Sequence, residues 1–390
     1  MKRSKLILFI SALMVLITIA AAVGEKGENE AREGFQPAVK AYELIQKKYY
    51  DREVLDRKQL LEAAIEGMLE ELPDEYNRLY DKKEYERYQK ELEGNYIGLG
   101  MEIAKRDDLI KVVAKFPGSP ADKAGIQAGD VLLGIDGEST EGMSVSEASS
   151  AIDGEAGTEV ILRVQDPDGA EKEITLTREE ITIPPVELNY LAGKEVALLD
   201  INLFSKDTPG DLAKKLREVT DQQGVVGFVI DLRNNTGGLL NSALSVASKF
   251  VDSGLITKLI GPEGEQREYE SSGNSVPNLP VAVLVNEGTA SASELVAAAV
   301  RDHDMGVLVG RNTFGKGLVQ TTHPVGNDFK LKLSSYEYLT PDGRSIPKDG
   351  LKPDLESDDP TRDTDLAINW VLEHAGQRTP LPGNGQVGLY

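Results

Sequence analysis

The stretch NEGTASASELVAAAVRDHDMGVLVGRNTFGKGLVQ, from Asn286 to Gln320, decides how the rest of the chain is interpreted. It follows Val281 to Val285, an unbroken apolar run typical of a strand that is buried on both faces of a sheet. Turn residues come next, and Ser291 to Val300 has a helical pattern. Ser291 is therefore expected at a strand-to-helix junction, where backbone N–H groups and the helix dipole favour a developing anion.

Two interpretations of Ser291 are open. Ser291 and Glu294 match the S-x-x-E capping box, so one interpretation is that the serine only caps a helix. Lys316 favours a catalytic interpretation, because it lies in the glycine-flanked segment FGKG before an expected strand, where a charge has no structural purpose. A lysine accepts a serine proton only when burial and neighbouring groups lower its pKa enough to leave it neutral. A Ser-Lys pair is a known variant of the catalytic triad.

The three histidines do not favour a Ser-His-Asp triad. His303 lies near the end of the expected helix, where a cation suits the dipole. His323 precedes a proline, and His374 lies in the carboxyl-terminal part of the chain.

These motifs resemble a known family. TASASE, followed by FGKGLVQ with its lysine 25 positions after the first serine of SAS, is similar to the carboxyl-terminal processing, or tail-specific, serine proteases of peptidase family S41. The resemblance implies that Ser291 is the nucleophile, that Lys316 is the general base, and that Gln320 orients the lysine. Spacing alone does not predict that last contact, because residues i and i+4 lie about 13 Å apart on a strand.

Composition is that of a globular protein. The chain has 390 residues, enough for two or three domains, with 40% hydrophobic and 28% charged residues. The absence of cysteine excludes disulfides, thiolate metal sites and a cysteine nucleophile. The sequence has no phosphate-binding loop and no ligand spacing typical of a metal site, so neither a cofactor nor a metal is expected.

The amino terminus has the pattern of an export signal. Three basic residues before Leu6 precede an apolar run from Leu6 to Val23 that ends in small residues. Residues 1–23 are predicted to be a signal peptide or, through residues 6–23, a membrane anchor, which places the catalytic part outside the cytoplasm. Residues 24–36 are a predicted polar tether. The net charge of -22 argues against nucleic acid as a partner.

Residues 37–93 are predicted to be a helical region. Val39, Tyr42, Ile45 and Tyr49 fall on one helix face, a pattern typical of packing surfaces. In the resembled family such a region often mediates dimerisation, so a homodimer is expected. The run from Leu72 to Glu75 departs from the DPHS-like run of the family.

Residues 94–181 resemble a PDZ domain in circularly permuted bacterial order. The resemblance rests on YIGLG, from Tyr96, and on GSPADKAGIQAGD, from Gly118. In such a domain successive backbone N–H groups bind the terminal carboxylate of a peptide that adds to the sheet edge. This implies protein substrates with apolar carboxyl termini. The residues expected to bind them are Ile97, Gly98, Leu99, Gly100 and Met101. Asp153 stands where the family commonly has arginine.

Residues 182–355 have an α/β pattern. Val225 to Leu232 is an expected buried strand, and Gly237 and Gly238 follow it in RNNTGG. A glycine pair after a strand forms either a simple turn or a close backbone approach that suits an oxyanion hole. The resemblance implies the second role, with the amide of Ala292 as the other donor, although Thr236 replaces the usual proline.

The predicted fold is therefore an α+β multidomain chain. It has a helical region, a PDZ domain inserted before a crotonase/Clp-like α/β protease core, and a carboxyl-terminal helix and tail at residues 356–390. The predicted function is an exported serine endopeptidase that cleaves near substrate tails. Two alternatives stay open: an inert PDZ-based peptide-binding adaptor, and an acyl-CoA enzyme on the same superfold.

Overall fold

The computed structural model describes residues 33–376, with gaps at residues 52, 54, 107, 223, 274, 277, 278 and 358. The expected export signal and residues 24–32 of the expected tether lie outside the described residues. Within the described part, no helix combines the length and the apolar character needed to cross a membrane. The chain divides into two compact units, Met1–Glu71 and Leu72–Tyr390.

The described part of the first unit is helical. Residues 33–48 form one helix, and α2 (Arg57–Glu70) begins after Asp56, whose carboxylate accepts the backbone N–H of Lys58 at 2.7 Å. Residues 33–36 had been expected to belong to the tether but are helical, since Phe35 lies one helical turn before Val39 and extends its stripe. The stripe stays open to solvent, with Val39 44% and Tyr49 43% exposed.

The region predicted to be helical, residues 37–93, also contains a strand that was not expected. Residues Arg78–Asp81 form a strand, β1, which pairs antiparallel with β18 (Phe329–Leu339). Leu79 and Tyr80 are buried by this pairing, so tertiary contacts override the local pattern. Helix α3 (Lys82–Leu92) follows directly, and Asp81 and Glu84 form a reciprocal capping box at its start.

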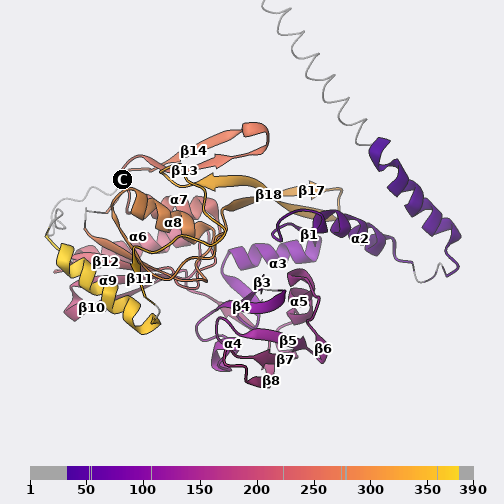
Figure 1. Ribbon diagram of the computed structural model, residues 1–390, viewed down its shortest axis with the longest axis horizontal. Coiled ribbons are helices and arrows are strands. Elements are labelled where there is room, and N and C mark those ends of the chain that lie inside the picture. Colours follow the sequence, from indigo (N-terminus) through magenta and orange to yellow (C-terminus); the bar gives the residue numbers. More distant parts are fainter. Residues whose placement is uncertain are drawn as a thin grey trace, which may run out of the picture. The chain divides into compact units, whose positions relative to one another are not determined.

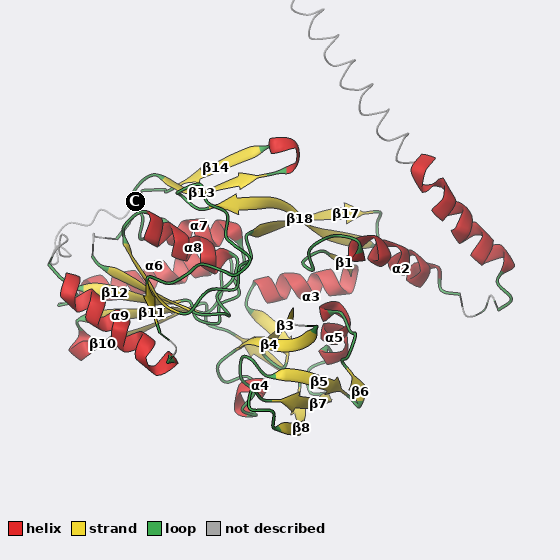
Figure 2. Ribbon diagram, in the orientation of Figure 1, coloured by secondary structure: helices red, strands yellow, loops and turns green. Residues whose placement is uncertain are grey.

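Residues 95–182 form the PDZ-like part of the second unit. Its main sheet has the order β3-β4-β5-β7-β8, with β6 paired to β5, and β2 pairs separately with β9. Helices α4 and α5 accompany these strands (Figure 2), and its buried core includes Leu99, Val112 and Leu162. The elements are β2 (Asn95–Gly98), β3 (Met101–Arg106), β4 (Leu109–Lys115), α4 (Pro120–Lys123), β5 (Val131–Ile135), β6 (Glu138–Ser139), α5 (Val145–Ile152), β7 (Glu159–Gln165), β8 (Glu171–Thr177) and β9 (Glu179–Thr182).

The α/β core is built on a six-stranded sheet in the order β10-β11-β12-β15-β16-β19. Only β10 runs antiparallel to its neighbour. Helices α6, α7 and α8 pack on one face, and α9 covers the other (Figure 1). The elements are β10 (Val186–Leu191), β11 (Val196–Ile201), α6 (Thr208–Asp221), β12 (Gly227–Asp231), α7 (Leu240–Ala247), β15 (Val281–Val285), α8 (Ala292–Asp302), β16 (Gly306–Gly310), β19 (Leu355–Glu356) and α9 (Pro360–His374).

A second sheet joins segments that are far apart in sequence. Its order is β1-β18-β13-β14, and β17 also pairs with β18. The remaining strands are β13 (Leu255–Ile260), β14 (Gln266–Glu270) and β17 (Leu318–Val325). The long strand β18 therefore connects the segment before the PDZ-like part to the strand that follows Lys316.

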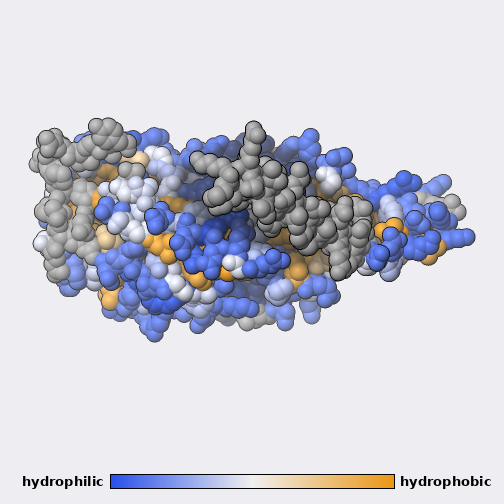
Figure 3. Space-filling model, turned by 90° about the horizontal axis from the view of Figure 1, so that it is seen from above, coloured by the Kyte–Doolittle hydropathy of each residue, from blue (hydrophilic) through white to orange (hydrophobic). Residues whose placement is uncertain are grey.

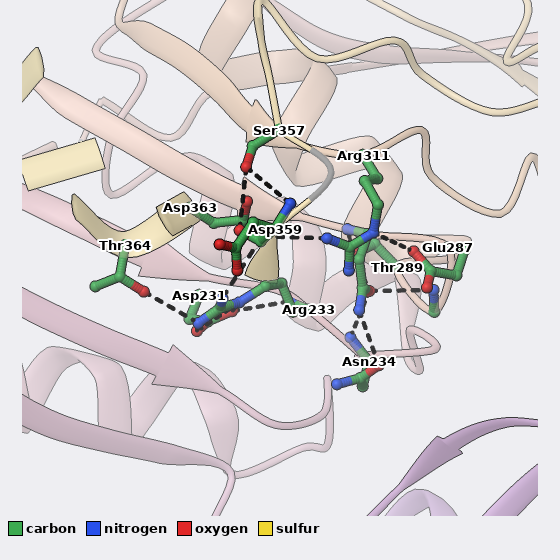
Figure 4. A network of polar contacts seen from close by, with 12 residues as sticks. Asp231, Arg233, Asn234, Glu287, Thr289, Arg311, Ser357, Asp359, Asp363 and Thr364 are labelled. Atoms are coloured by element: carbon green, nitrogen blue, oxygen red, sulfur yellow. Dashed lines mark hydrogen bonds and ion pairs between the residues drawn. The ribbon is translucent and has the colours of Figure 1, made fainter. Parts of the chain in front are cut away.

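A buried ionic network holds α9 to the core sheet (Figure 4). Asp363 of α9 is fully buried, and its Oδ2 lies 3.7 Å from Arg233 and 3.4 Å from Arg311. Arg233 also pairs with Asp231 at the end of β12. The network thus ties the last helix to the carboxyl ends of two central strands.

The surface is largely hydrophilic on the face shown in Figure 3, where the atoms drawn in grey do not cover it. This agrees with a charged content of 28% and a strongly negative net charge.

Candidate active site

Ser291 lies between β15 and α8, at the predicted strand-to-helix junction. Its backbone has φ 54° and ψ -115°, a conformation that a residue with a side chain seldom adopts. Strain of this kind, about 1–3 kcal/mol, persists only where the surrounding structure enforces it, and it concentrates at functional sites. The sharp turn therefore does more than start a helix.

Glu294 enforces this turn. Its carboxylate is fully buried and accepts four hydrogen bonds, at 2.5 to 2.8 Å. The donors are the backbone N–H groups of Ser291, Gly315 and Lys316 and the hydroxyl of Thr313. Burial raises the pKa of Glu294, and the hydrogen bonds from Thr313, Lys316, Gly315 and Ser291 oppose this rise. The sequence predicted Glu294 only as a helix cap, so this second role was missed.

Tyr338 makes a second bridge between the same two segments. Its buried hydroxyl lies 2.8 Å from the carbonyl oxygen of Ser291 and 2.7 Å from that of Lys316, and it shares its one proton between them. No local motif marks this tyrosine. The turn that carries the serine and the loop that carries the lysine are therefore fixed to each other through both N–H and C=O groups.

Lys316 lies in a protected environment. Its Nζ stands 4.4 Å from the centroid of the Tyr76 ring, directly after the run that departs from the family pattern. Burial lowers the pKa of Lys316, while Glu102, Glu294 and more distant carboxylates oppose this lowering. Desolvation is the largest of these effects, and it favours the neutral amine that a general base requires.

Gln320 lies on β17 next to an irregularity in its pairing with β18. Its amide nitrogen donates to the carbonyl oxygen of Leu318 at 3.1 Å and lies 3.5 Å from the hydroxyl of Ser334. Gln320 and Lys316 line the same cavity. No hydrogen bond joins the two side chains in the described part of the chain, so the orienting role of Gln320 stays a prediction.

The glycine loop lies directly against the serine. Gly237 and Gly238 have φ of 108° and 137°, and a Cβ added to Gly237 would lie 3.0 Å from the Cβ of Ser291. The N–H of Gly237 donates to Oδ1 of Asn235 at 2.9 Å. The N–H of Gly238 has no acceptor among the described residues, and Ala292 is the first residue of α8, where N–H groups lack helical partners. This leaves Gly238 and Ala292 as the available pair.

The five residues predicted to bind a peptide end line the same cavity as Ser291 and Lys316. They span the end of β2, the turn at Gly100 and the start of β3. Side chains of α5 complete the lining, among them Val145 and Ile152. The cavity has a volume of about 460 Å³, and its mixture of apolar side chains and backbone suits an extended peptide.

Strand β3 also reaches the catalytic loops. Burial raises the pKa of Glu102. A side-chain hydrogen bond with Thr236 and the charge of Lys316 oppose this rise. Arg106 lies four residues after Glu102 on the same strand, and its guanidinium stacks on the Phe314 ring, 3.9 Å from the centroid. The PDZ-like sheet therefore contacts the segments on both sides of the candidate nucleophile.

Asp153, where the family commonly has arginine, closes α5. Its carboxylate pairs with the guanidinium of Arg87 on α3 at 2.7 Å. The peptide-binding helix is thereby linked to the helix that follows β1.

Comparisons with known proteins agree with this arrangement. Residues 195–357 match peptidase family S41, residues 116–166 match a PDZ domain, and residues 17–84 match the N-terminal domain of the activating protease CtpB. These matches confirm the predicted order of helical region, PDZ domain and α/β core.

Curated relatives cover most of the chain. A probable CtpA-like serine protease of Staphylococcus aureus (strain bovine RF122 / ET3-1) is 36% identical over 324 residues, 82% of this chain and 64% of the relative. One from Staphylococcus haemolyticus (strain JCSC1435) is 35% identical over 350 residues, 87% of this chain and 69% of the relative. The chain thus spans less than two thirds of the Staphylococcus aureus protein.

Among solved structures, the photosystem II D1 C-terminal processing protease aligns with a TM-score of 0.70 and 30% identity. The alignment covers 86% of this chain and 96% of the other. The predicted resemblance and fold class are therefore confirmed.

Proposed function

The chain belongs to peptidase family S41, and on that basis we propose that it is a serine endopeptidase that cleaves proteins near their carboxyl termini. One observation carries the proposal. Ser291, Lys316, the glycine loop and the predicted peptide-binding turn line one cavity. A binding adaptor needs the turn but has no use for a strained serine and a half-buried lysine in the same cavity.

The proposed chemistry uses residues of this chain alone. The Ser291 hydroxyl oxygen attacks the scissile carbonyl carbon while its proton passes to the neutral amine of Lys316. The backbone N–H groups of Gly238 and Ala292 stabilise the oxyanion. Lys316 then returns the proton to the leaving amine, and a water molecule hydrolyses the acyl-enzyme by the reverse proton path.

Gln320 would orient Lys316 once its amide turns away from the Leu318 carbonyl. Both side chains line the same cavity, which supports a contact between them.

The proposed substrates are proteins with an apolar carboxyl terminus. The turn from Ile97 to Met101 would bind the terminal carboxylate through backbone N–H groups, and the apolar side chains of α5 would take the last side chains of the substrate. Because these residues line the same cavity as Ser291, binding of the substrate terminus would bring a segment near the tail to Ser291.

Export and dimerisation are also proposed. The basic and apolar pattern of residues 1–23 supports an extracytoplasmic location, with a membrane anchor at residues 6–23 if the segment is retained. The exposed apolar stripe that includes Val39 and Tyr42 supports a homodimer through the helical region.

Cleavage of an unfolded protein with an apolar carboxyl terminus tests the activity. The full chain should cleave it, and Ser291→Ala and Lys316→Ala should not. Lys330→Ala is the matched control, since Lys330 lies on β18 outside the cavity lining and should keep full activity. If the wild type and all three variants leave the substrate intact but still bind its tail, the adaptor interpretation replaces the protease.

A further inference from the structure

A second lysine lines the cavity that holds Ser291 and Lys316. Lys332 lies in the middle of β18, opposite Arg78 of β1 on one side and Thr322 of β17 on the other. The proposed catalytic chemistry gives it no role.

Lys332 is surrounded by tyrosine rings and by basic groups. Its Nζ lies 4.9 Å from the centroid of Tyr88 and 5.5 Å from that of Tyr80. Among the described residues, no carboxylate oxygen lies within 4.0 Å of this Nζ. Burial, together with the charges of Lys316 and Arg78, lowers the pKa of Lys332 to about 8. The carboxylates of Glu102 and Glu91 act in the opposite direction, as weaker effects.

Packing does not explain a charge at this position. A partly buried ammonium without a carboxylate against it is unfavourable, and a like charge directly opposite on the paired strand adds to the cost. The two rings offset only part of this through cation–π attraction. A methionine would fill the same space between Tyr80 and Tyr88 without any charge. The ammonium is therefore best explained by an anion that enters the cavity.

We propose that Lys332 forms a carboxylate-binding subsite in the cleavage cavity and makes the enzyme prefer substrates that present a carboxylate close to the scissile bond. This inference rests on the proposed proteolytic function and adds a specificity-determining residue to it. The ring faces of Tyr80 and Tyr88 hold the lysine side chain, and its ammonium donates to the incoming carboxylate.

The carboxylate has two sources in a polypeptide. It belongs either to an aspartate or glutamate side chain near the cleaved bond, or to the free carboxyl terminus of a substrate that is cleaved very close to its end. Both present the same group to Lys332, and different peptides separate them.

The first experiment measures kcat/KM for matched peptides. One glutamate is moved through the positions that flank the cleaved bond, and each peptide has a glutamine counterpart. At one or more positions the wild type should prefer glutamate by about tenfold or more, the effect expected of a charged hydrogen bond. Lys332→Met should abolish this preference, so that each glutamate peptide has the same kcat/KM as its glutamine counterpart. A second set compares free and amidated carboxyl termini on glutamine peptides; loss of that discrimination in Lys332→Met identifies the terminal carboxylate as the source.

Lys330→Met is the control. Lys330 is two residues away on the same face of β18, with its Nζ 5.7 Å from the centroid of Tyr85, and it does not line the cavity. This variant should keep the preference for a carboxylate. In the wild type the preference should weaken as the pH rises through about 8, because a neutral amine no longer attracts an anion. A wild type with no preference in either set, or a preference that survives in Lys332→Met, overturns the subsite.

A binding assay separates this inference from the proposed activity. The same peptides are labelled with a dye, and their binding to Ser291→Ala is measured by fluorescence anisotropy. This measurement does not depend on catalysis. The acidic peptide should bind about tenfold more tightly than its glutamine counterpart, and the double variant Ser291→Ala/Lys332→Met should bind both equally. Absence of cleavage by the wild type would count against the protease alone, whereas equal binding of both peptides to Ser291→Ala would count against the subsite.

Discussion

The backbone N–H groups of Ser291 and Lys316 donate to the same oxygen, Oε2 of Glu294, at 2.8 Å each. The two residues are 25 positions apart in sequence, and one carboxylate sets the spacing of their backbones. The candidate nucleophile and base are therefore positioned by a group that takes no part in the proposed proton transfer.

Glu294→Gln should disable the site and lower stability. An amide nitrogen cannot accept hydrogen bonds, so at least one pair of buried N–H or O–H donors loses its partner, at a cost of about 1–3 kcal/mol per group. We expect kcat to fall by about a hundredfold or more, with a lower urea midpoint. Glu287→Gln is the control, because Glu287 is largely exposed and pairs only with Arg311 in the described part of the chain. Wild-type kcat in Glu294→Gln would show that the carboxylate is only structural.

Tyr338→Phe should lower kcat more than it changes KM. The substitution removes the hydroxyl that joins the carbonyl groups of Ser291 and Lys316 but keeps the buried ring. We expect about a fivefold loss of kcat, since one neutral hydrogen bond contributes about 1 kcal/mol. Tyr336→Phe, on the same strand, removes a hydroxyl whose contact is with Glu265 at 3.4 Å and should leave kcat unchanged. Steady-state kinetics of both variants provide the comparison, and equal values would remove Tyr338 from the site.

Glu102→Gln should shift the pH dependence of cleavage to lower pH. A carboxylate near Lys316 favours the charged ammonium and so raises the pKa of the lysine. Without that charge the lysine becomes neutral at lower pH, and the rising limb of kcat/KM against pH moves in the acidic direction. Glu138→Gln, on the exposed strand β6, should leave the profile in place. A shift of Glu102→Gln toward alkaline pH would contradict this electrostatic relationship.

Asp363→Ala should destabilise the core. The substitution removes the carboxylate that Arg233 and Arg311 share, while each keeps a second one, Asp231 or Glu287, so the expected cost is about 1–3 kcal/mol. Asp365→Ala, two residues further along the same helix and exposed, should change the free energy of unfolding by less than about 0.5 kcal/mol. Urea unfolding of the two variants measures the difference. Similar values would show that the network in Figure 4 adds little to stability.

The sequence predicted those parts of the molecule that follow local rules. The strand Val281–Val285 was predicted with its observed bounds, and the helix after it begins at Ala292, next to Ser291. An apolar run and a turn determine both elements, so no distant contact was needed to find them. The PDZ domain was predicted through its motif, and family comparison confirms it.

The parts that were missed depend on distant contacts. The S-x-x-E pattern accounted for Glu294 locally, so its bonds to the loop around Gly315 had no separate signal in the sequence. The role of Tyr338 follows from the register of β18, which brings its hydroxyl to a turn 47 residues away. Strand β1 pairs with residues about 250 positions later, and its short length gave no strand pattern. Lys332 has no separate signal in the sequence, because the cavity it lines forms only once β1 and β18 pair.

The positive φ of Ser291 sets thermal stability against activity at a single position. Glycine adopts such backbone angles without strain, so Ser291→Gly should relax the turn while it removes the hydroxyl that the proposed reaction needs. Directed evolution for heat resistance alone would therefore favour a residue that ends activity. A thermostable variant that keeps its activity has to gain its resistance to heat elsewhere in the fold.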